Sequence, residues 1–185
     1  MPSSVSALPL LIRRANPGDA SALASFAAAA FADTFAADNR SEDMAAYLGA
    51  AFGEAQQRAE LLDPACIVRL AERGGLLTGY AMLRASAVPA AASVAAGGSA
   101  LEIARLYSGR QWIGTGVGAA LMQDCLDVAA AHQYEWVWLG VWERNERAIA
   151  FYARWGFTDV GSQFFQLGAD RQTDRIMARR VTAQE

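Results

Sequence analysis

Apolar and polar positions along this chain of 185 residues alternate between strand-like and helix-like spacing. The run "LLIRR" at 10–14 predicts a strand, and "NPGDA" predicts the turn after it. Apolar residues then recur three and four positions apart, which predicts a helix with one apolar face and Asp19 as its N-cap. The residues of that face are Leu23, Phe26, Ala30, Phe31 and Phe35.

Two more helices and three strands are predicted in the middle of the chain. "SEDMAAYLGAAF" is typical of a helix with Ser41 as its cap, and "EAQQRAELL" of a shorter helix that ends before Pro64. The strands are expected at 66–72, 76–85 and 101–108. Small residues fill the insert at 86–100, which predicts a mobile loop or hairpin tip.

The last third of the chain alternates helix and strand patterns. A helix is predicted from Val117 to about His132, a Trp- and Val-rich strand at 135–142, and a helix at 145–155 followed by Gly156. "FTDVGSQFFQLG" and "DRIMARRVT" predict two closing strands. This order indicates an α/β or α+β fold with mixed strand directions, in one domain spanning 1–185 without repeats or linkers.

Composition limits the classes of function. The chain is 54% hydrophobic and 19% charged, which is typical of a globular protein, and its net charge of −3 argues against a general nucleic-acid binder. One His and two isolated cysteines give no metal-site spacing, so Cys66 and Cys125 are interpreted as buried apolar residues. Without a signal peptide or an uninterrupted apolar span of about 20 residues, a cytoplasmic protein outside the membrane is expected.

Three glycines stand two apart at the start of the helix predicted from Val117. Helix N-termini leave backbone N–H groups unpaired and carry partial positive charge, and glycine lets an anion approach the backbone. Strand, glycine loop and helix together therefore predict a phosphate site, with unpaired amides between Thr115 and Ala119.

Two common phosphate motifs fit this stretch poorly. A Walker loop needs lysine, and all sixteen basic residues of the chain are arginine. In the dinucleotide fingerprint, Gly114 and Gly116 would be the first pair and Ala119 would take the third position. That fingerprint usually follows the first strand of its unit, whereas this stretch lies past the middle of the chain.

"LYSGRQWIGTGVGAALM" resembles the acyl-CoA loop of the GNAT superfamily of acetyltransferases, whose pattern is Arg/Gln-x-x-Gly-x-Gly/Ala. The register 111–116 matches literally, while 113–118 fits the loop length better and is preferred; it places Ile113 where the family prefers Arg or Gln. The resemblance implies acetyl-CoA as co-substrate and no metal. The implied cofactor-binding residues here are Leu106, Tyr107, Ser108, Ile113, Gly114, Thr115, Gly116, Val117, Gly118 and Ala119.

"VWERNERAIAFYARWGF" resembles the family's second cofactor segment, Asn-x-x-Ala-x-x-Phe-Tyr followed by Gly-Phe. Asn145 and Tyr152 are seven residues apart, two helical turns, and so share a face. The resemblance implies that Asn145 caps the helix and binds the pantetheine arm while Tyr152 faces the sulfur. "IRRANPGDASAL" and "GFTDVG" extend it over nearly the whole chain and imply a mostly antiparallel central sheet of about six to seven strands with about four helices.

A finer resemblance concerns the acceptor. "DTF" at 33–35 and "LGADRQTDRIM" at 167–177 are similar to the bacterial spermidine/spermine N-acetyltransferase branch. The implied substrate is a small primary amine such as a polyamine. Asp33, Asp38 and Asp174 could attract such a cation, or be ordinary surface charges.

The reaction implied is acetyl transfer to a primary amine by direct attack in a ternary complex. The amine must be neutral, the oxyanion needs a donor, and the departing thiolate needs a proton. The resemblance implies a backbone N–H within 106–108 as the donor, where this strand would diverge from the strand at 135–142. It makes Tyr152 the general acid, against the alternative that "FY" is a core aromatic pair.

The general base is less defined. Glu102 lies six residues before Ser108, an offset that resembles the strand glutamate of the histone-acetylating branch; the alternative is an exposed glutamate at a strand start. Glu143 and a water relay are the other options. Two other functions stay open: a non-catalytic acyl-CoA-binding regulatory protein and a nucleotide-dependent oxidoreductase. A homodimer is a further expectation.

Overall fold

The computed structural model describes residues 8–94 and 98–181. In that part of the chain it contains seven strands, the upper end of the predicted range, and five α-helices rather than about four. The strands are β1 (Leu10–Arg14), β2 (Cys66–Arg73), β3 (Leu76–Ala85), β4 (Ala100–Ser108), β5 (Trp136–Trp142), β6 (Thr158–Leu167) and β7 (Asp170–Arg180). The α-helices are α1 (Ala20–Phe35), α2 (Ser41–Ala51), α3 (Glu54–Leu62), α4 (Val117–Ala131) and α5 (Glu146–Arg154), with short 3-10 turns η2 (Pro17–Asp19), η3 (Ala36–Asp38) and η4 (Arg110–Trp112).

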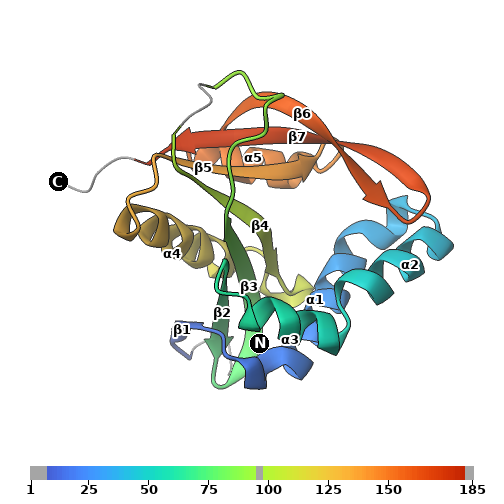
Figure 1. Ribbon diagram of the computed structural model, residues 1–185. Helices are drawn as coiled ribbons and strands as arrows, with labels where there is room; N and C mark the ends of the chain where they lie inside the picture. Colours follow the sequence, from blue (N-terminus) through green and yellow to red (C-terminus); the bar gives the residue numbers. More distant parts are fainter. Residues whose placement is uncertain (1–7, 95–97, 182–185) are drawn as a thin grey trace. The chain divides into compact units, whose positions relative to one another are not determined.

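The strands form one sheet in the order β1-β2-β3-β4-β5-β7-β6 (Figure 1). The pairs β1–β2, β5–β7 and β6–β7 are antiparallel, and β4–β5 is parallel. A parallel pair needs a crossover connection, and α4 provides it between β4 and β5. The predicted mixed, mostly antiparallel sheet with flanking helices is confirmed.

The chain divides into two compact units. Unit 1 comprises Met1–Met82 and Arg105–Asp124, and unit 2 comprises Leu83–Ala104 and Cys125–Glu185. The elements β3, β4 and α4 each contribute residues to both units. Each unit is described by itself below, and a single domain over 1–185 stays a prediction.

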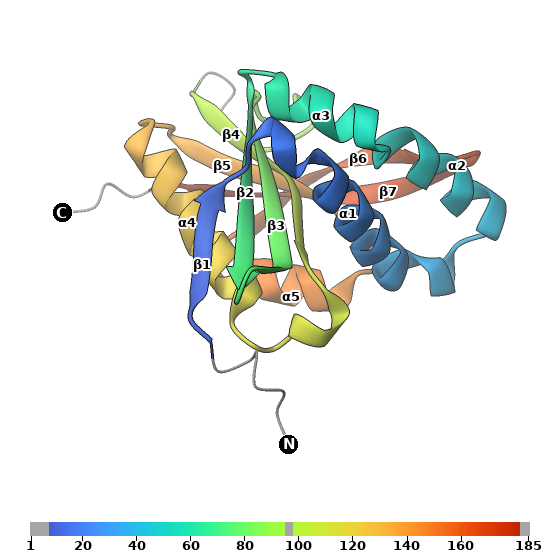
Figure 2. The same ribbon diagram turned by 90° about the horizontal axis from the view of Figure 1, so that it is seen from below.

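Unit 1 packs its helices beside β1, β2 and the first part of β3 (Figure 2). The apolar face of α1 is buried at Leu23 and Phe31, as predicted, and the Phe31 ring lies 4.7 Å from the Tyr47 ring and 5.4 Å from the Phe52 ring. Across this aromatic cluster, Arg105 of β4 donates to Glu60 of α3 at 2.7 and 3.1 Å. This ion pair between α3 and β4 is buried. Removing either side chain would leave the other as an unpaired buried charge, which is strongly destabilising.

Of the two predicted helix caps, one is confirmed in position only and the other is wrong by one residue. Asp19 is the N-cap residue of α1, but its side chain makes no capping bond, because its carboxylate accepts from the guanidinium of Arg13 and the backbone N–H of Asn16. Asn16 instead accepts from the N–H of Gly18 and caps the 3-10 turn that precedes α1. The Arg13 contact, followed by the Asn16 N–H, lowers the pKa of Asp19. In α2, Ser41 is the first helical residue rather than its cap.

Among the residues that the structure describes, one helical stretch, Pro17–Asp38, is long and apolar enough to cross a membrane by length and composition alone. Its central residues Leu23, Ala27 and Phe31 are buried within unit 1.

Unit 2 is built on the long β6–β7 hairpin and on β5 beside β7 (Figure 1). Side chains of β4, β5, β6 and β7 form its buried cluster, and part of the insert packs against that cluster. The buried residues are Ala100, Trp138, Val160, Ile176 and Ala178, with Val88, Ala92, Val94 and Trp136 against them.

Residues 86–94 of the insert form a loop without helix or strand, and this loop packs against β6; its mobility stays a prediction. The N–H of Ser93 donates to the carbonyl of Val160, and a Cβ on Gly161 would lie 2.5 Å from the carbonyl oxygen of Ala91. Glycine at 161 therefore lets the insert approach β6. Residues 95–97 lie outside the described residues.

Candidate functional site

The predicted glycine loop begins with a type II turn from Trp112 to Thr115. Ile113 has φ −65° and ψ 132°, and Gly114 has φ +80°, a value that the third position of such a turn requires. The N–H of Thr115 closes the turn on the carbonyl of Trp112 at 3.3 Å, and its hydroxyl donates to the same oxygen at 2.8 Å. Turn geometry therefore accounts for Gly114 without any ligand.

Gly116 joins this turn to α4 with φ +90°, again in the left-handed region. The first helical bond of α4 runs from the N–H of Ala120 to the carbonyl of Gly116. For the amides of Gly116, Val117, Gly118 and Ala119, no protein acceptor is found among residues 8–94 and 98–181. A Cβ on Gly116 would meet no atom within 4 Å, so open space lies on that side of Gly116.

Four amides, those of residues 116–119, are unpaired over the described ranges of the chain, whereas the sequence predicted unpaired amides over residues 115–119. Thr115 was expected to present a free N–H, and this is wrong, because that N–H closes the type II turn. The four amides that follow are the arrangement that binds anions at helix N-termini.

The start of α4 is fixed against β3 by a residue that sequence reasoning missed. A Cβ on Gly79 would lie 2.7 Å from Cγ1 of Val117, 2.9 Å from Leu121 and 2.8 Å from the carbonyl oxygen of Tyr107. Glycine here lets helix and strand approach closely. An isolated glycine inside a strand pattern is the signal that could have indicated it.

The other predicted cofactor residues of unit 1 follow on β4. Leu106, Tyr107 and Ser108 are half-buried, and the Tyr107 ring stacks on Tyr80 at 5.8 Å. The end of β4 that precedes the glycine turn is therefore held in unit 1 by aromatic packing.

In unit 2, Glu102 stands where β4 pairs with β5. The parallel register covers Ala100–Glu102 against Trp136–Trp138 and ends there within the described residues. Glu102 is half-buried, so the alternative of an exposed strand-start glutamate is wrong. Burial raises the pKa of Glu102, while the charge of Arg84 opposes that shift. A carboxylate with a raised pKa is a better proton acceptor than an ordinary one.

The second motif lies on α5, also in unit 2. Asn145 is the N-cap, as predicted, and its side-chain oxygen accepts from the N–H of Ala148 at 3.2 Å. Tyr152 is 8% exposed and lies against Phe151 and Phe157 at ring distances of 5.5 and 6.0 Å. Burial, and to a smaller extent Cys125, raises the pKa of Tyr152. Its hydroxyl is therefore protonated at neutral pH, and the raised pKa makes it a weaker proton donor than an ordinary tyrosine.

Of the three aspartates considered for an amine, Asp33 and Asp38 are exposed and Asp174 is half-buried. The Asp174 carboxylate lies over Gly140, where a Cβ would meet Oδ2 of Asp174 at 3.1 Å and Nε2 of Gln163 at 2.8 Å. Burial, and then the charge of Glu143, raises the pKa of Asp174 to about 6. Asp174 is therefore not an ordinary surface charge.

Asp174→Asn is expected to stabilise the protein at pH 7.5 and to change little at pH 4. The native pKa lies above the ordinary value near 4, so the native state holds a proton that the unfolded state releases. Stability is then fully present below about pH 4 and is lost as pH rises to about 6. Allowing for partial exposure, we expect about 1–2 kcal/mol in the free energy of unfolding at pH 7.5, measured by urea denaturation.

Asp38→Asn is the matched control, because it makes the same substitution at an exposed aspartate. Equal stability differences for Asp174→Asn at both pH values would contradict the raised pKa of Asp174.

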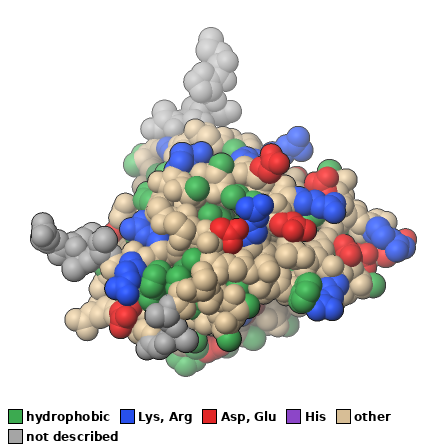
Figure 3. Space-filling view, turned by 90° about the horizontal axis from the view of Figure 1, so that it is seen from above, with side chains coloured by type: hydrophobic (Ala, Val, Ile, Leu, Met, Phe, Trp, Pro, Cys, Tyr) green, Lys and Arg blue, Asp and Glu red, His purple; other side chains and the backbone are tan. Residues whose placement is uncertain are grey.

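Away from these site residues, the surface carries both positive and negative side chains. Acidic and basic side chains are interspersed over the face drawn in Figure 3. Within the described part of the chain, no three His, Cys, Asp or Glu side chains gather as a metal site. Cys66 and Cys125 are buried, as predicted.

Comparison with known proteins identifies the class. Residues 29–157 match the model of the acetyltransferase (GNAT) family. The chain belongs to this family, and the prediction of an N-acetyltransferase is confirmed.

Two relatives and two solved structures illustrate the match. The chain is 34% identical over 149 residues to an uncharacterized N-acetyltransferase of Lactobacillus delbrueckii subsp. lactis, covering 80% of this chain and 84% of the relative. It is 34% identical over 163 residues to an uncharacterized N-acetyltransferase of Mycobacterium bovis, covering 88% and 98%.

The solved structures share the fold at low sequence identity. One is the PaiA N-acetyltransferase of Thermoplasma acidophilum in complex with coenzyme A, with a TM-score of 0.76, 17% identity and coverage of 94% and 99%. Another is a putative acetyltransferase of Salmonella typhimurium with its cofactor acetyl-CoA, with a TM-score of 0.63, 21% identity and 96% coverage of both chains. None of these matches assigns the chain to the spermidine/spermine branch.

Proposed function

We propose that this protein transfers the acetyl group of acetyl-CoA to a small primary amine by direct attack in a ternary complex. The observation that carries the proposal is the turn before α4, where Gly116 adopts φ +90° and four successive amides have no protein acceptor among the described residues. Family membership supports the choice of ligand, because solved members are complexes with coenzyme A or acetyl-CoA.

In this proposal the amides of residues 116–119 hold the diphosphate, beside Ile113, Gly114 and Thr115. Backbone amides at residues 116–119 suit an anion because they are fixed before binding and carry the positive end of α4. Leu106, Tyr107 and Ser108 pair with the pantetheine arm, and Asn145 contacts it beyond its capping bond.

The chemistry requires two proton transfers. The amine nitrogen attacks the thioester carbon, the C–S bond breaks, and a backbone N–H within 106–108 stabilises the oxyanion. Tyr152 donates its proton to the departing sulfur. Glu102, or water relayed to it, accepts the proton that the amine loses, and its raised pKa supports this role. Glu143 is the alternative base.

For the acceptor we propose a polyamine, in keeping with the sequence resemblance at 33–35 and 167–177. The half-buried Asp174, with Glu143 close enough to raise its pKa, supports recognition of a cation. Asp33 and Asp38 add exposed negative charge.

Cytoplasmic location and a homodimer remain proposals. The outermost strands of the sheet, β1 and β6, carry the exposed apolar side chains Leu11 (58%) and Phe164 (66%). Edge strands with exposed apolar residues are common pairing surfaces.

A second candidate is a non-catalytic acyl-CoA-binding regulatory protein. Ile113, which is 43% exposed at the position where the family pattern has Arg or Gln, favours it. Both candidates predict cofactor binding, and turnover separates them.

The test measures release of free CoA thiol from acetyl-CoA across a panel of amines that includes spermidine, together with calorimetric titration of CoA. Amine-dependent thiol release with one preferred amine supports the enzyme. Binding without release for any amine favours the regulatory protein. Absence of CoA binding, with stabilisation by NAD(P) in a thermal-shift assay, would overturn the proposal in favour of an oxidoreductase.

A further inference from the structure

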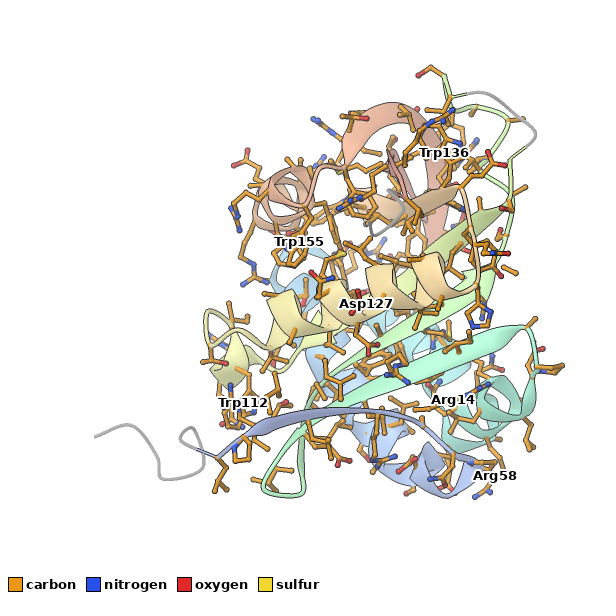
Figure 4. All side chains as sticks on the ribbon, turned by 90° about the vertical axis from the view of Figure 1, so that its left-hand side faces the viewer. Arg14, Arg58, Trp112, Asp127, Trp136 and Trp155 are labelled. Carbon is orange, nitrogen blue, oxygen red and sulfur yellow. The ribbon has the colours of Figure 1, made fainter. Side chains whose placement is uncertain are left out.

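Arg73, the last residue of β2, reaches the glycine turn from a distant part of unit 1. Its guanidinium donates to the carbonyl of Leu8 at 2.7 Å and to the carbonyl of Thr115 at 3.3 Å. It also lies 6.0 Å from the centroid of the Trp112 ring, and Figure 4 labels that tryptophan at the loop before α4. No motif in the sequence pointed to this arginine.

The contact with Thr115 falls on the peptide unit that begins the row of unpaired amides. The carbonyl of Thr115 and the N–H of Gly116 belong to one planar unit, and no cis peptide bond occurs in the described chain. In a trans peptide the N–H points away from the C=O. By holding the carbonyl oxygen, Arg73 therefore fixes the Gly116 N–H in the opposite direction.

Thr115 is also held through its own N–H and hydroxyl groups. The N–H and hydroxyl of Thr115 both donate to the carbonyl of Trp112. Gly114 and Gly116, with φ +80° and +90°, are the flexible joints on either side of Thr115. Without Arg73 the peptide between Thr115 and Gly116 could rotate about ψ of Thr115 and φ of Gly116, because glycine tolerates both signs of φ.

We propose that Arg73 is a positioning residue for cofactor binding, which orients the Thr115–Gly116 peptide so that the Gly116 amide meets the diphosphate. It also supplies a positive charge beside a turn whose own sequence has Ile113 at the position of the family's Arg or Gln. The inference rests on the proposed function, since it needs coenzyme A at this turn.

The experiment titrates CoA by calorimetry into wild type, Arg73→Ala, Arg73→Lys and Arg58→Ala. Arg58 is an exposed arginine of α3 that pairs with Glu54, and Figure 4 shows it far from Trp112. Arg58→Ala therefore removes the same charge without touching the turn. A second measurement follows the amide signals of ¹⁵N-glycine-labelled protein, with Gly49 of α2, which has open space around it, as the internal reference.

We expect Arg73→Ala to weaken CoA binding about tenfold, comparable to losing one hydrogen bond to a charged group. Arg73→Lys should recover part of this loss, because lysine keeps the charge but not the fork that bridges two carbonyls. The Gly116 amide should shift on CoA addition in wild type and shift much less in Arg73→Ala, while Gly118 still responds at saturating CoA.

Two results would overturn the inference while leaving the proposed function intact. In the first, wild type binds CoA, and the dissociation constants of Arg73→Ala and Arg58→Ala for CoA differ by no more than about twofold. The other is weakened binding in Arg73→Ala with an unchanged Gly116 response, which would indicate a purely structural role. If wild type does not bind CoA, the proposed function fails first and the inference with it.

Discussion

Tyr152→Phe is expected to lower the rate of amine acetylation by about 100- to 1,000-fold while leaving CoA affinity unchanged. The substitution removes only the hydroxyl, so the buried ring keeps its packing against Phe151 and Phe157. The proton for the departing sulfur must then come from water, which is the slower route. Thiol release at saturating acetyl-CoA measures the rate, and calorimetry measures CoA affinity.

Tyr134→Phe is the matched control, because Tyr134 is a tyrosine of the same unit that lies before β5 and contacts His132. It should retain wild-type turnover. If Tyr152→Phe also retains wild-type turnover, the aromatic pair is a packing feature and the general acid lies elsewhere.

Gly116→Val is expected to weaken CoA binding by about 100-fold. At φ +90° a β-branched residue is strained, so the turn must change its φ and move the amides of residues 116 and 117. No atom lies within 4 Å of the added Cβ, so the loss of stability should be limited to about 1–2 kcal/mol of backbone strain. Titration of CoA and urea denaturation measure the two effects.

The control for this variant is Gly49→Val. Gly49 is also surrounded by open space, but it lies within α2 and not in the left-handed region. CoA affinity should be unchanged in Gly49→Val. A Gly116→Val protein that binds CoA like wild type would show that the amides before α4 do not hold the diphosphate.

The two sets of variants separate binding from chemistry. Gly116→Val acts on affinity, whereas Tyr152→Phe acts on turnover at full occupancy. If Tyr152→Phe instead loses CoA affinity and keeps its turnover at saturation, Tyr152 contributes to cofactor binding and not to proton transfer.

Local sequence signals determined the elements and the positions of both motifs. The α4 helix begins at Val117, Asn145 caps α5, and Gly156 follows that helix with φ +80°, all as the sequence predicted. These features depend on the spacing of apolar residues, on one capping side chain or on one left-handed residue, and all of them are determined within a few positions of the chain.

Tertiary structure decided the features that depend on partners far away in the sequence. Glu72 pairs with Arg13 from 59 positions away, and Arg13 in turn binds the Asp19 carboxylate, which makes no capping bond to α1. Likewise, β6 accepts a hydrogen bond from Ser93 of the insert. Burial raises the pKa values of Glu102 and Asp174, and Arg73 reaches a turn 42 positions away. Periodicity cannot show these contacts, because the distance between two residues in space is set by how strands and helices pack and not by their separation along the chain.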